Sequence, residues 1–129
     1  MKTCGQPFSE TIVAIYVKQI LIGLDYLHKK GVIHRDIKGG NILTTRDGIV
    51  KLADFGVSTK LDADSEENKQ DDQFAGSAFW MAPEVVEMKG ITTACDIWSL
   101  GCTVIELLKG KPPNYDCNNV CAAMIKIVK

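Results

Sequence analysis

The sequence predicts a mainly α-helical fold with one small β-hairpin. Two segments, residues 9–30 and residues 94–109, carry apolar side chains at the spacing of a helix. Between them, short β-type runs at residues 41–44 and 49–52 flank the turn sequence Arg46-Asp47-Gly48. A chain of 129 residues fits a single domain with a moderate hydrophobic core.

Charge and composition argue against several classes of partner. The formal net charge is −1, so we expect no overall electrostatic attraction to nucleic acid or to a membrane surface. We expect no membrane span, because no apolar run reaches the necessary length, and no signal peptide ahead of the first helix. The five cysteines show no C-x-x-C spacing and no nearby His pair, so reduced thiols and no structural zinc are expected. The chain is therefore interpreted as soluble and cytoplasmic.

The first predicted helix begins after Ser9. Serine suits the N-cap position, and Gly31 is the residue type expected just beyond the last turn. The positions expected to face the core are Ile12, Val13, Ile15, Tyr16, Ile20, Leu24 and Leu27. His28, near the end of the helix, is interpreted as a surface or boundary residue rather than a catalytic one.

Residues 32–43, with the sequence VIHRDIKGGNIL, bring three chemically useful side chains close together. Asp36 supplies a carboxylate, Lys38 an ammonium and Asn41 a carboxamide. Phosphoryl transfer from a nucleotide needs such a set, because a carboxylate accepts the hydroxyl proton, a cation stabilises the phosphate and an oxygen donor holds a metal ion. The predicted hairpin returns the chain so that Asp54 lies near Asn41, and two such oxygen ligands suit Mg²⁺.

Residues 54–84 show little periodicity and carry a run of acidic side chains in their middle. Such a stretch cannot bury itself, and the simplest interpretation is a mobile, solvated loop. The stretch also contains the hydroxyl side chains of Ser58, Thr59 and Ser65.

The second predicted helix spans about residues 94–109, with Thr93 as the expected N-cap and Gly110 ending it. Apolar residues surround its axis almost completely, so we expect the helix to be buried on all sides. Asp96 is then a carboxylate in a buried helix and needs partners. The alternative for Asp96 is a favourable interaction with the helix dipole alone. Residues 118–129 are predicted to begin a further helix.

Three motifs follow one another in a characteristic order: HRDIKGGNIL at residues 34–43, DFG at residues 54–56 and APE at residues 82–84. This ordered series resembles the signature set of the eukaryotic protein kinase catalytic domain. Four segments most resemble the sequences of the sterile-type serine/threonine kinases: HRDIKGGNIL, VKLADFG, FWMAPEV and DIWSLGCTVIEL. That group includes kinase-kinase-kinases and the septation-initiation kinases.

The resemblance implies a role for each residue that matches the motifs. Asp36 would be the catalytic base, Lys38 would contact the transferred phosphate, and Asn41 and Asp54 would hold the metal ion. Leu43 would form the floor beneath the adenine ring of ATP. The alternative is plain core packing, and the two roles do not exclude each other. Regulatory or structural roles are implied for His34, Arg35, Phe55, Gly56, Glu84 and Asp96, the last through bonds to the backbone of the catalytic loop.

The resemblance also implies a substrate class. Lys38, two residues after Asp36, follows the serine/threonine pattern rather than the tyrosine pattern. In the family, a hydroxyl at the position of Ser77 bonds the catalytic aspartate and lysine. Threonine is commoner there, so the serine is a mild departure that keeps the hydroxyl.

By this resemblance, residues 1–129 are a partial kinase domain with a catalytic loop at 32–43, an activation segment at 54–84 and a buried central helix at about 94–109. In the activation segment, three hydroxyls could accept a regulatory phosphate, and the sequence does not rank them: Ser58, Thr59 and Ser65. Arg35 is the cation that would receive that phosphate. No G-x-G-x-x-G loop or V-A-I-K lysine precedes the catalytic loop, so we expect an incomplete large lobe without the small lobe, inactive by itself. The expected function is a serine/threonine protein kinase that uses ATP and Mg²⁺, with a protein substrate and an upstream kinase or activator. The alternatives are a non-catalytic protein-interaction module and a metal-dependent hydrolase.

Overall fold

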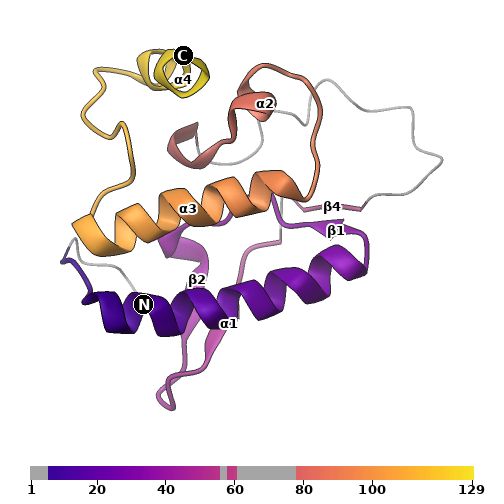
Figure 1. Cartoon of the computed structure of the whole chain (residues 1–129), viewed down its shortest axis with the longest axis vertical. Helices are drawn as coiled ribbons and strands as arrows, with labels where there is room; N and C mark the ends of the chain where they lie inside the picture. The colour runs from indigo at the N-terminus through magenta and orange to yellow at the C-terminus, as the bar shows by residue number, and fades with distance from the viewer. Residues whose placement is uncertain (1–5, 56–57, 61–77) are drawn as a thin grey trace.

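Two helices that lie side by side form the centre of the fold, α1 (Glu10–Lys29) and α3 (Ala94–Lys109) (Figure 1). The structure is a computed structural model, and it describes residues 6–55, 58–60 and 78–129. The other elements are short: β1 (Val32–Ile33), the 3₁₀ turn η1 (Gly39–Asn41), β2 (Ile42–Thr44), β3 (Val50–Leu52), β4 (Thr59–Lys60), the 3₁₀ turn η2 (Ala78–Trp80), α2 (Pro83–Val86) and α4 (Val120–Val128). The prediction of a mainly helical fold with a small hairpin is confirmed.

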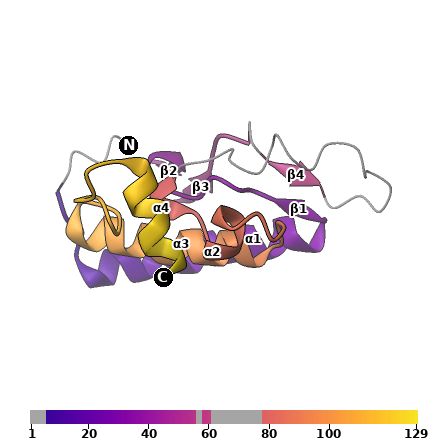
Figure 2. The same ribbon diagram turned by 90° about the horizontal axis from the view of Figure 1, so that it is seen from above.

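The helices and strands occupy two layers. Figure 2 shows the helices on one side and the short strands on the other. One core cluster joins α1 and α3 to the hairpin, through Ile20, Leu24, Ile37, Ile42 and Leu100. A second cluster joins β1, α2 and the start of α3, through Ile33, Met81, Ala82, Val85 and Cys95. The segment from residue 32 to residue 43 contributes to both clusters, so both hold it in place.

The first helix begins and ends where the sequence predicted. Ser9 is the N-cap, and its side-chain oxygen accepts a hydrogen bond from the Ile12 N–H at 3.5 Å. Gly31 follows the last turn with φ of 71°, a left-handed conformation that glycine adopts without a steric penalty. The buried residues of the helix are Val13, Ile20 and Leu24. The predicted core face is wrong for Ile12 and Ile15, which are 40% and 52% exposed, because the described elements cover only the opposite side of α1.

The length of α1 corrects another expectation. An 18-residue stretch of α1 has a mean hydropathy of 1.2, so by length and composition alone this helix could cross a membrane, contrary to the expectation that no apolar run is long enough. Length and composition are weak evidence for a span, because a core helix of a soluble protein meets the same test. Here the side chain of Gln19 bonds the hairpin, donating to the Gly48 carbonyl at 3.2 Å and accepting from the Val50 N–H at 2.8 Å. We therefore describe α1 as a helix that packs on the hairpin and on α3.

The predicted hairpin is confirmed as β2 paired antiparallel with β3. Gly48 lies in its turn with φ of 77°, which explains the glycine in the turn sequence. Beyond β3, the Ala53 N–H donates to the Asn41 carbonyl at 2.9 Å. The hairpin therefore returns the chain to η1 just before Asp54.

A second two-stranded sheet was not predicted. Strand β1 pairs antiparallel with β4, with Ile33 opposite Thr59. The low periodicity of residues 54–84 also gave no sign of β4, η2 or α2. Each of these elements is short and contacts a distant part of the chain, so local periodicity could not reveal it. The acidic run falls within residues 61–77, outside the described residues.

The predicted bounds of the second long helix are confirmed, but its predicted burial is not. Gly110 ends α3 with φ of 79°. Thr93 occupies the N-cap position without a side-chain bond, and instead Oγ1 of Thr92 accepts the first N–H of the helix at 3.3 Å. Burial on all sides is wrong for the part of the chain that the structure describes, since Ile97 and Trp98 are 50% and 44% exposed. An apolar composition indicates that burial of the helix surface is favourable. It does not indicate that the described residues bury it.

The helix expected near residue 118 is confirmed as α4. Asn119 is its N-cap, with Oδ1 accepting the Ala122 N–H at 2.8 Å. The helix packs on α2 and η2, and Ala123 is fully buried there. This contact places α4 over the segment that follows the acidic run (Figure 1).

Candidate active site

Asp36, Lys38 and Asn41 come together in the loop between β1 and β2. The side-chain nitrogen of Asn41 donates to the Asp36 carbonyl at 2.8 Å and to Asp36 Oδ2 at 2.9 Å. The Lys38 Nζ lies 3.8 Å from the same Oδ2. Both hydrogen atoms of the carboxamide are directed to Asp36, so Oδ1 is the Asn41 atom suited to a cation. The loop thus combines an oriented carboxylate with a nearby ammonium and an amide oxygen.

Asp54 lies beyond the hairpin with an exposed side chain. The preceding residue, Ala53, is bonded to the backbone of Asn41, so the two expected metal ligands belong to neighbouring chain segments. Asp54 has φ of 57°, in the left-handed region that residues with a side chain seldom adopt. Non-glycine residues in this region occur preferentially at functional sites, where the surrounding structure maintains them.

His34 connects the loop between β1 and β2 to the end of the hairpin. It is fully buried, and its Nδ1 accepts the Asp36 N–H at 3.1 Å while Nε2 donates to the Ala53 carbonyl at 2.9 Å. The backbone donor at Nδ1 requires the tautomer that carries its hydrogen on Nε2. The Phe55 ring packs against the imidazole, with ring centroids 4.9 Å apart. One histidine therefore sets the spacing between the backbone at Asp36 and the backbone next to Asp54.

The carboxylate of Asp96, at the start of α3, holds the same segment from its other side. Oδ2 accepts the His34 N–H at 2.9 Å and lies 2.7 Å from His28 Nε2, and Oδ1 accepts the Arg35 N–H at 2.8 Å. Asp96 is fully buried, and these donors offset the cost of burying its charge. Arg35 has φ of 71°, a strained conformation for a non-glycine residue, and the Asp96 bonds maintain it. A purely helix-dipole role for Asp96 is therefore wrong, and His28 is a boundary residue as expected.

Asp96 begins a row of four polar residues on one side of α3, here called the polar face: Asp96, Ser99, Thr103 and Glu106. Their spacing of three, four and three positions places them on one side of a helix. Ser99 Oγ donates to the Trp80 carbonyl at 2.6 Å, and Thr103 Oγ1 lies 3.3 Å from the Ile37 carbonyl. Ser99, Thr103 and Glu106 were not among the residues predicted for the site. Their helical spacing within an otherwise apolar helix was the signal that could have found them.

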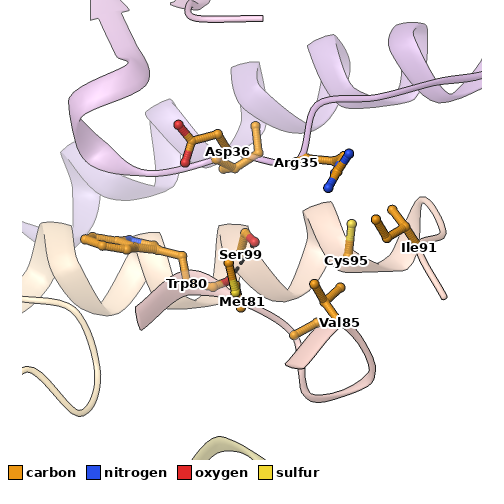
Figure 3. Close-up of a pocket in the computed structure, with 10 residues that line it drawn as sticks. Arg35, Asp36, Trp80, Met81, Val85, Ile91, Cys95 and Ser99 are labelled. Carbon is orange, nitrogen blue, oxygen red and sulfur yellow. Dashed lines mark hydrogen bonds between the residues drawn. The ribbon is translucent and has the colours of Figure 1, made fainter. Parts of the chain in front are cut away.

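A pocket lies between the loop that joins β1 to β2, α2 and α3 (Figure 3). Its lining residues are Arg35, Asp36, Ile37, Trp80, Met81, Ala82, Val85, Ile91, Cys95 and Ser99. Figure 3 shows the Arg35 guanidinium on the side of Cys95 and Ile91, whereas the Asp36 carboxylate points away from Arg35. The pocket thus has a cationic end and an apolar wall, and it adjoins the proposed base.

The Cys95 thiol in this pocket is not a nucleophile. Burial raises its pKa to about 12, and the neighbouring carboxylates of Asp96 and Glu84 act in the same direction. A thiol with so high a pKa stays neutral at physiological pH and behaves as a small apolar side chain. Burial likewise raises the pKa of Cys102, in the next turns of α3, to about 11.

The remaining predicted residues fall in several places. Leu43 is 44% exposed on β2, so plain core packing is wrong for it. Glu84 lies in the first turn of α2. Ser58 is exposed and its Oγ donates to the Phe55 carbonyl at 2.8 Å, and Thr59 lies in β4. Gly56, Ser65 and Ser77 lie outside the described residues, so their roles stay predictions.

Comparison with known protein families decides the family. A family model described as the protein kinase domain matches residues 2–129. The chain belongs to the protein kinase family. The resemblance inferred from the three ordered motifs is confirmed.

The kinase relatives include proteins from yeast, plant and mould. The chain is 59% identical over 120 residues to Cell division control protein 7 of Schizosaccharomyces pombe. It is 57% identical over 123 residues to MAP3K epsilon protein kinase 1 of Arabidopsis thaliana, and 58% identical over 121 residues to Cytokinesis protein sepH of Emericella nidulans. These alignments cover 93%, 95% and 94% of this chain but 11%, 9% and 8% of the respective relatives. The chain therefore spans about a tenth of the length of these kinases.

The donor set of the site is compatible with the ATP and Mg²⁺ that kinases of this family generally use. Among the described residues, no group of three or more His, Cys, Asp or Glu side chains could hold a metal ion by itself. Mg²⁺ does not need such a group, because it keeps water ligands and takes phosphate oxygens. The Asn41 amide oxygen and the Asp54 carboxylate are donors of the kind that Mg²⁺ prefers. The residues present therefore fit the ion.

Proposed function

We propose that this site is the catalytic centre of a serine/threonine protein kinase, which transfers the γ-phosphate of ATP to a hydroxyl of a protein substrate. The observation that carries the proposal is the grouping of Asp36, Lys38 and Asn41 in one loop, with Asp54 delivered beside it by the hairpin. In this proposal the chain is part of the large lobe. The catalytic loop is residues 32–43, the activation segment residues 54–84 and the central helix α3.

Each residue has a distinct task in the proposed reaction. Asp36 accepts the proton of the attacking hydroxyl, and the Asn41 amide bond to Oδ2 orients its carboxylate. Lys38 stabilises the negative charge of the phosphate. Asn41 and Asp54 hold Mg²⁺, which neutralises charge on the phosphates when it is bound. The exposed Leu43 side chain supports the proposal that this residue lies under the adenine ring.

The pocket beside Asp36 supports a role in docking the protein substrate. Trp80, Met81 and Ala82 line it, and Ser99 fixes this segment to α3. At its other end, Arg35 is the proposed receptor for a phosphate added to the activation segment by an upstream kinase. The proposed phosphate acceptors are Ser58, Thr59 and Ser65, with Ser77 proposed to contact the base. An intracellular signalling role in the cytoplasm is part of the proposal, because the relatives are named for cell division, cytokinesis and a MAP3K.

Replacing Asp54 tests the metal assignment. In the longest form of the protein that carries residues 1–129, Asp54→Asn should abolish Mg²⁺-supported phosphate transfer while the urea unfolding midpoint stays unchanged. Asp47→Asn, at the exposed turn of the same hairpin, is the matched control and should retain activity. Near-normal turnover by Asp54→Asn would contradict the metal role. Failure of the wild-type protein to phosphorylate any Ser or Thr substrate would contradict the function itself.

A further inference from the structure

Glu106, the last residue of the polar face, connects two parts of the site that are distant in sequence. Its Oε2 accepts a hydrogen bond from the Gly39 N–H and another from Trp80 Nε1, each at 2.9 Å. Gly39 directly follows Lys38, and Trp80 ends η2. One carboxylate oxygen therefore fixes both the backbone beside Lys38 and the indole ring of η2.

The Glu106 carboxyl group lies so close to Gly39 that a side chain at position 39 would move it. A Cβ atom on Gly39 would lie 2.7 Å from Glu106 Oε1 and 3.0 Å from its carboxyl carbon. Any side chain at this buried position would therefore displace the carboxylate. Proline would in addition remove the N–H that Glu106 accepts. The glycine and the glutamate are thus matched to each other.

The indole ring held by Glu106 lies next to the ammonium of Lys38. Nζ of Lys38 is 5.9 Å from the centre of the Trp80 ring and 3.8 Å from Asp36 Oδ2. A cation over an aromatic face is attracted by the ring quadrupole, most strongly for tryptophan. The position of the Trp80 ring therefore influences where Lys38 places its charge relative to Asp36.

We propose that Glu106 is a positioning residue for Lys38 and Asp36, and that it acts through the Trp80 ring and the Gly39 backbone. The inference rests on the proposed kinase function and adds a residue that lies outside the three catalytic motifs. Glu106 contacts neither nucleotide nor substrate in this role. Phosphoryl transfer depends on the placement of charged groups more than on covalent chemistry, so displacing Lys38 lowers kcat.

Two substitutions of Glu106 separate the hydrogen bonds from the bulk of the side chain. Glu106→Ala removes both bonds, whereas Glu106→Gln keeps an acceptor oxygen within reach of both donors. In the longest form of the protein that carries residues 1–129, Glu106→Ala should lower kcat roughly 10- to 100-fold with little change in the KM for ATP. Glu106→Gln should retain most of the activity. Glu87→Ala removes a surface carboxylate paired with Lys89 and, as the matched control, leaves kcat unchanged.

Trp80→Phe distinguishes positioning from general destabilisation. It removes the indole N–H, keeps an aromatic ring and should lower kcat in the wild-type background. In the Glu106→Ala background it should have no further effect, because both residues act through one contact. Hydrogen exchange of the Trp80 indole N–H, measured by NMR, is independent of activity. That exchange should be slow in the wild-type protein and in Glu106→Gln, and fast in Glu106→Ala.

Three results would overturn the inference. An active wild-type protein whose kcat is unchanged by Glu106→Ala would overturn it alone and leave the kinase function standing. Effects of Glu106→Ala and Trp80→Phe that multiply would show that the two residues act separately. Absence of phosphate transfer by the wild-type protein would overturn the proposed function and, with it, this inference, whatever the indole exchange shows.

Discussion

The two sides of α3 share one helix but differ in what they contact. The polar face bonds the backbone or side chains of His34, Arg35, Gly39 and Trp80. The opposite side carries Ile97, Trp98 and Ile105, which are exposed among the described residues. These polar groups thus contact the rest of the fold, whereas these three large apolar groups stay exposed among the described residues. The mean polarity of a helix therefore does not predict which of its sides bonds a functional site.

The reason lies in what each kind of contact can specify. Apolar packing favours proximity but has no direction, so it tolerates shifts of the partner segment. A carboxylate that accepts backbone N–H groups specifies both the distance and the orientation of the bonded segment. A catalytic loop with a strained residue such as Arg35 needs the second kind of contact. Two carboxylates of the polar face supply it, those of Asp96 and Glu106.

Removing the first residue of the polar face should have the largest effect on stability. Asp96→Ala leaves the His34 and Arg35 N–H groups without their acceptor in a buried site. We expect the free energy of unfolding, measured in urea, to fall by about 3–5 kcal/mol. Asp25→Ala, in an exposed ion pair with Lys29, is the control and should cost about 0.5 kcal/mol or less. A loss below about 1 kcal/mol for Asp96→Ala would show that the polar face does not stabilise the loop.

The next largest difference should be between two apolar truncations on different sides of α3, measured as losses in the free energy of unfolding. Leu100 is 5% exposed in the core cluster beneath the hairpin, so Leu100→Ala should cost about 2–5 kcal/mol. Ile97 is 50% exposed, so Ile97→Ala should change the free energy of unfolding by no more than about 0.5 kcal/mol. Both values come from urea titrations of the same protein. Similar losses at the two positions would mean that the apolar side is covered after all.

The buried thiols of α3 should make the free energy of unfolding depend on pH, with a smaller effect than the substitutions above. Burial raises the pKa of Cys95 to about 12 and that of Cys102 to about 11, from an ordinary value of 9.0. Below pH 9 both thiols are neutral in the folded and unfolded states, so they cause no pH dependence. Above pH 9 the unfolded thiols ionise and the folded ones do not, so stability falls by at most about 1.4 kcal/mol per pH unit for each thiol.

Urea midpoints at about pH 8 and about pH 10 measure this slope. The double variant Cys95→Ala, Cys102→Ala should show a shallower decline than the wild-type protein, whatever its stability at the lower pH. Cys121→Ala, which removes an exposed thiol, should leave the slope unchanged. Equal slopes in all three proteins would contradict the burial of the α3 thiols.

The parts of the site encoded locally were predictable from the sequence. The spacing of Asp36, Lys38 and Asn41 within one short loop indicated their chemistry directly. The turn sequence around Gly48 predicted the hairpin, and the hairpin implied that Asp54 returns to Asn41. The caps at Ser9 and Gly110 were predictable for the same reason, since each depends on a single residue type at a helix end.

The parts that depend on contacts between distant segments were not predictable in the same way. Strand β4 is two residues long and exists only through its pairing with β1, so no local pattern marks it. The exposure of Ile97 depends on which other segments cover α3, which its own sequence does not state. Glu106 belongs to no local motif that assigns it to the site. Its partners, Gly39 and Trp80, become visible only when the fold brings them together.

Amide hydrogen exchange, measured residue by residue, tests most directly whether the polar face of α3 holds the catalytic loop. The wild-type protein should protect the Arg35 and Gly39 N–H groups strongly, because each donates to a carboxylate of α3. Asp96→Asn should accelerate exchange at Arg35 more than at Gly39, and Glu106→Ala should do the reverse. Rapid exchange of both amides in the wild-type protein, or no selectivity between the two variants, would contradict this account.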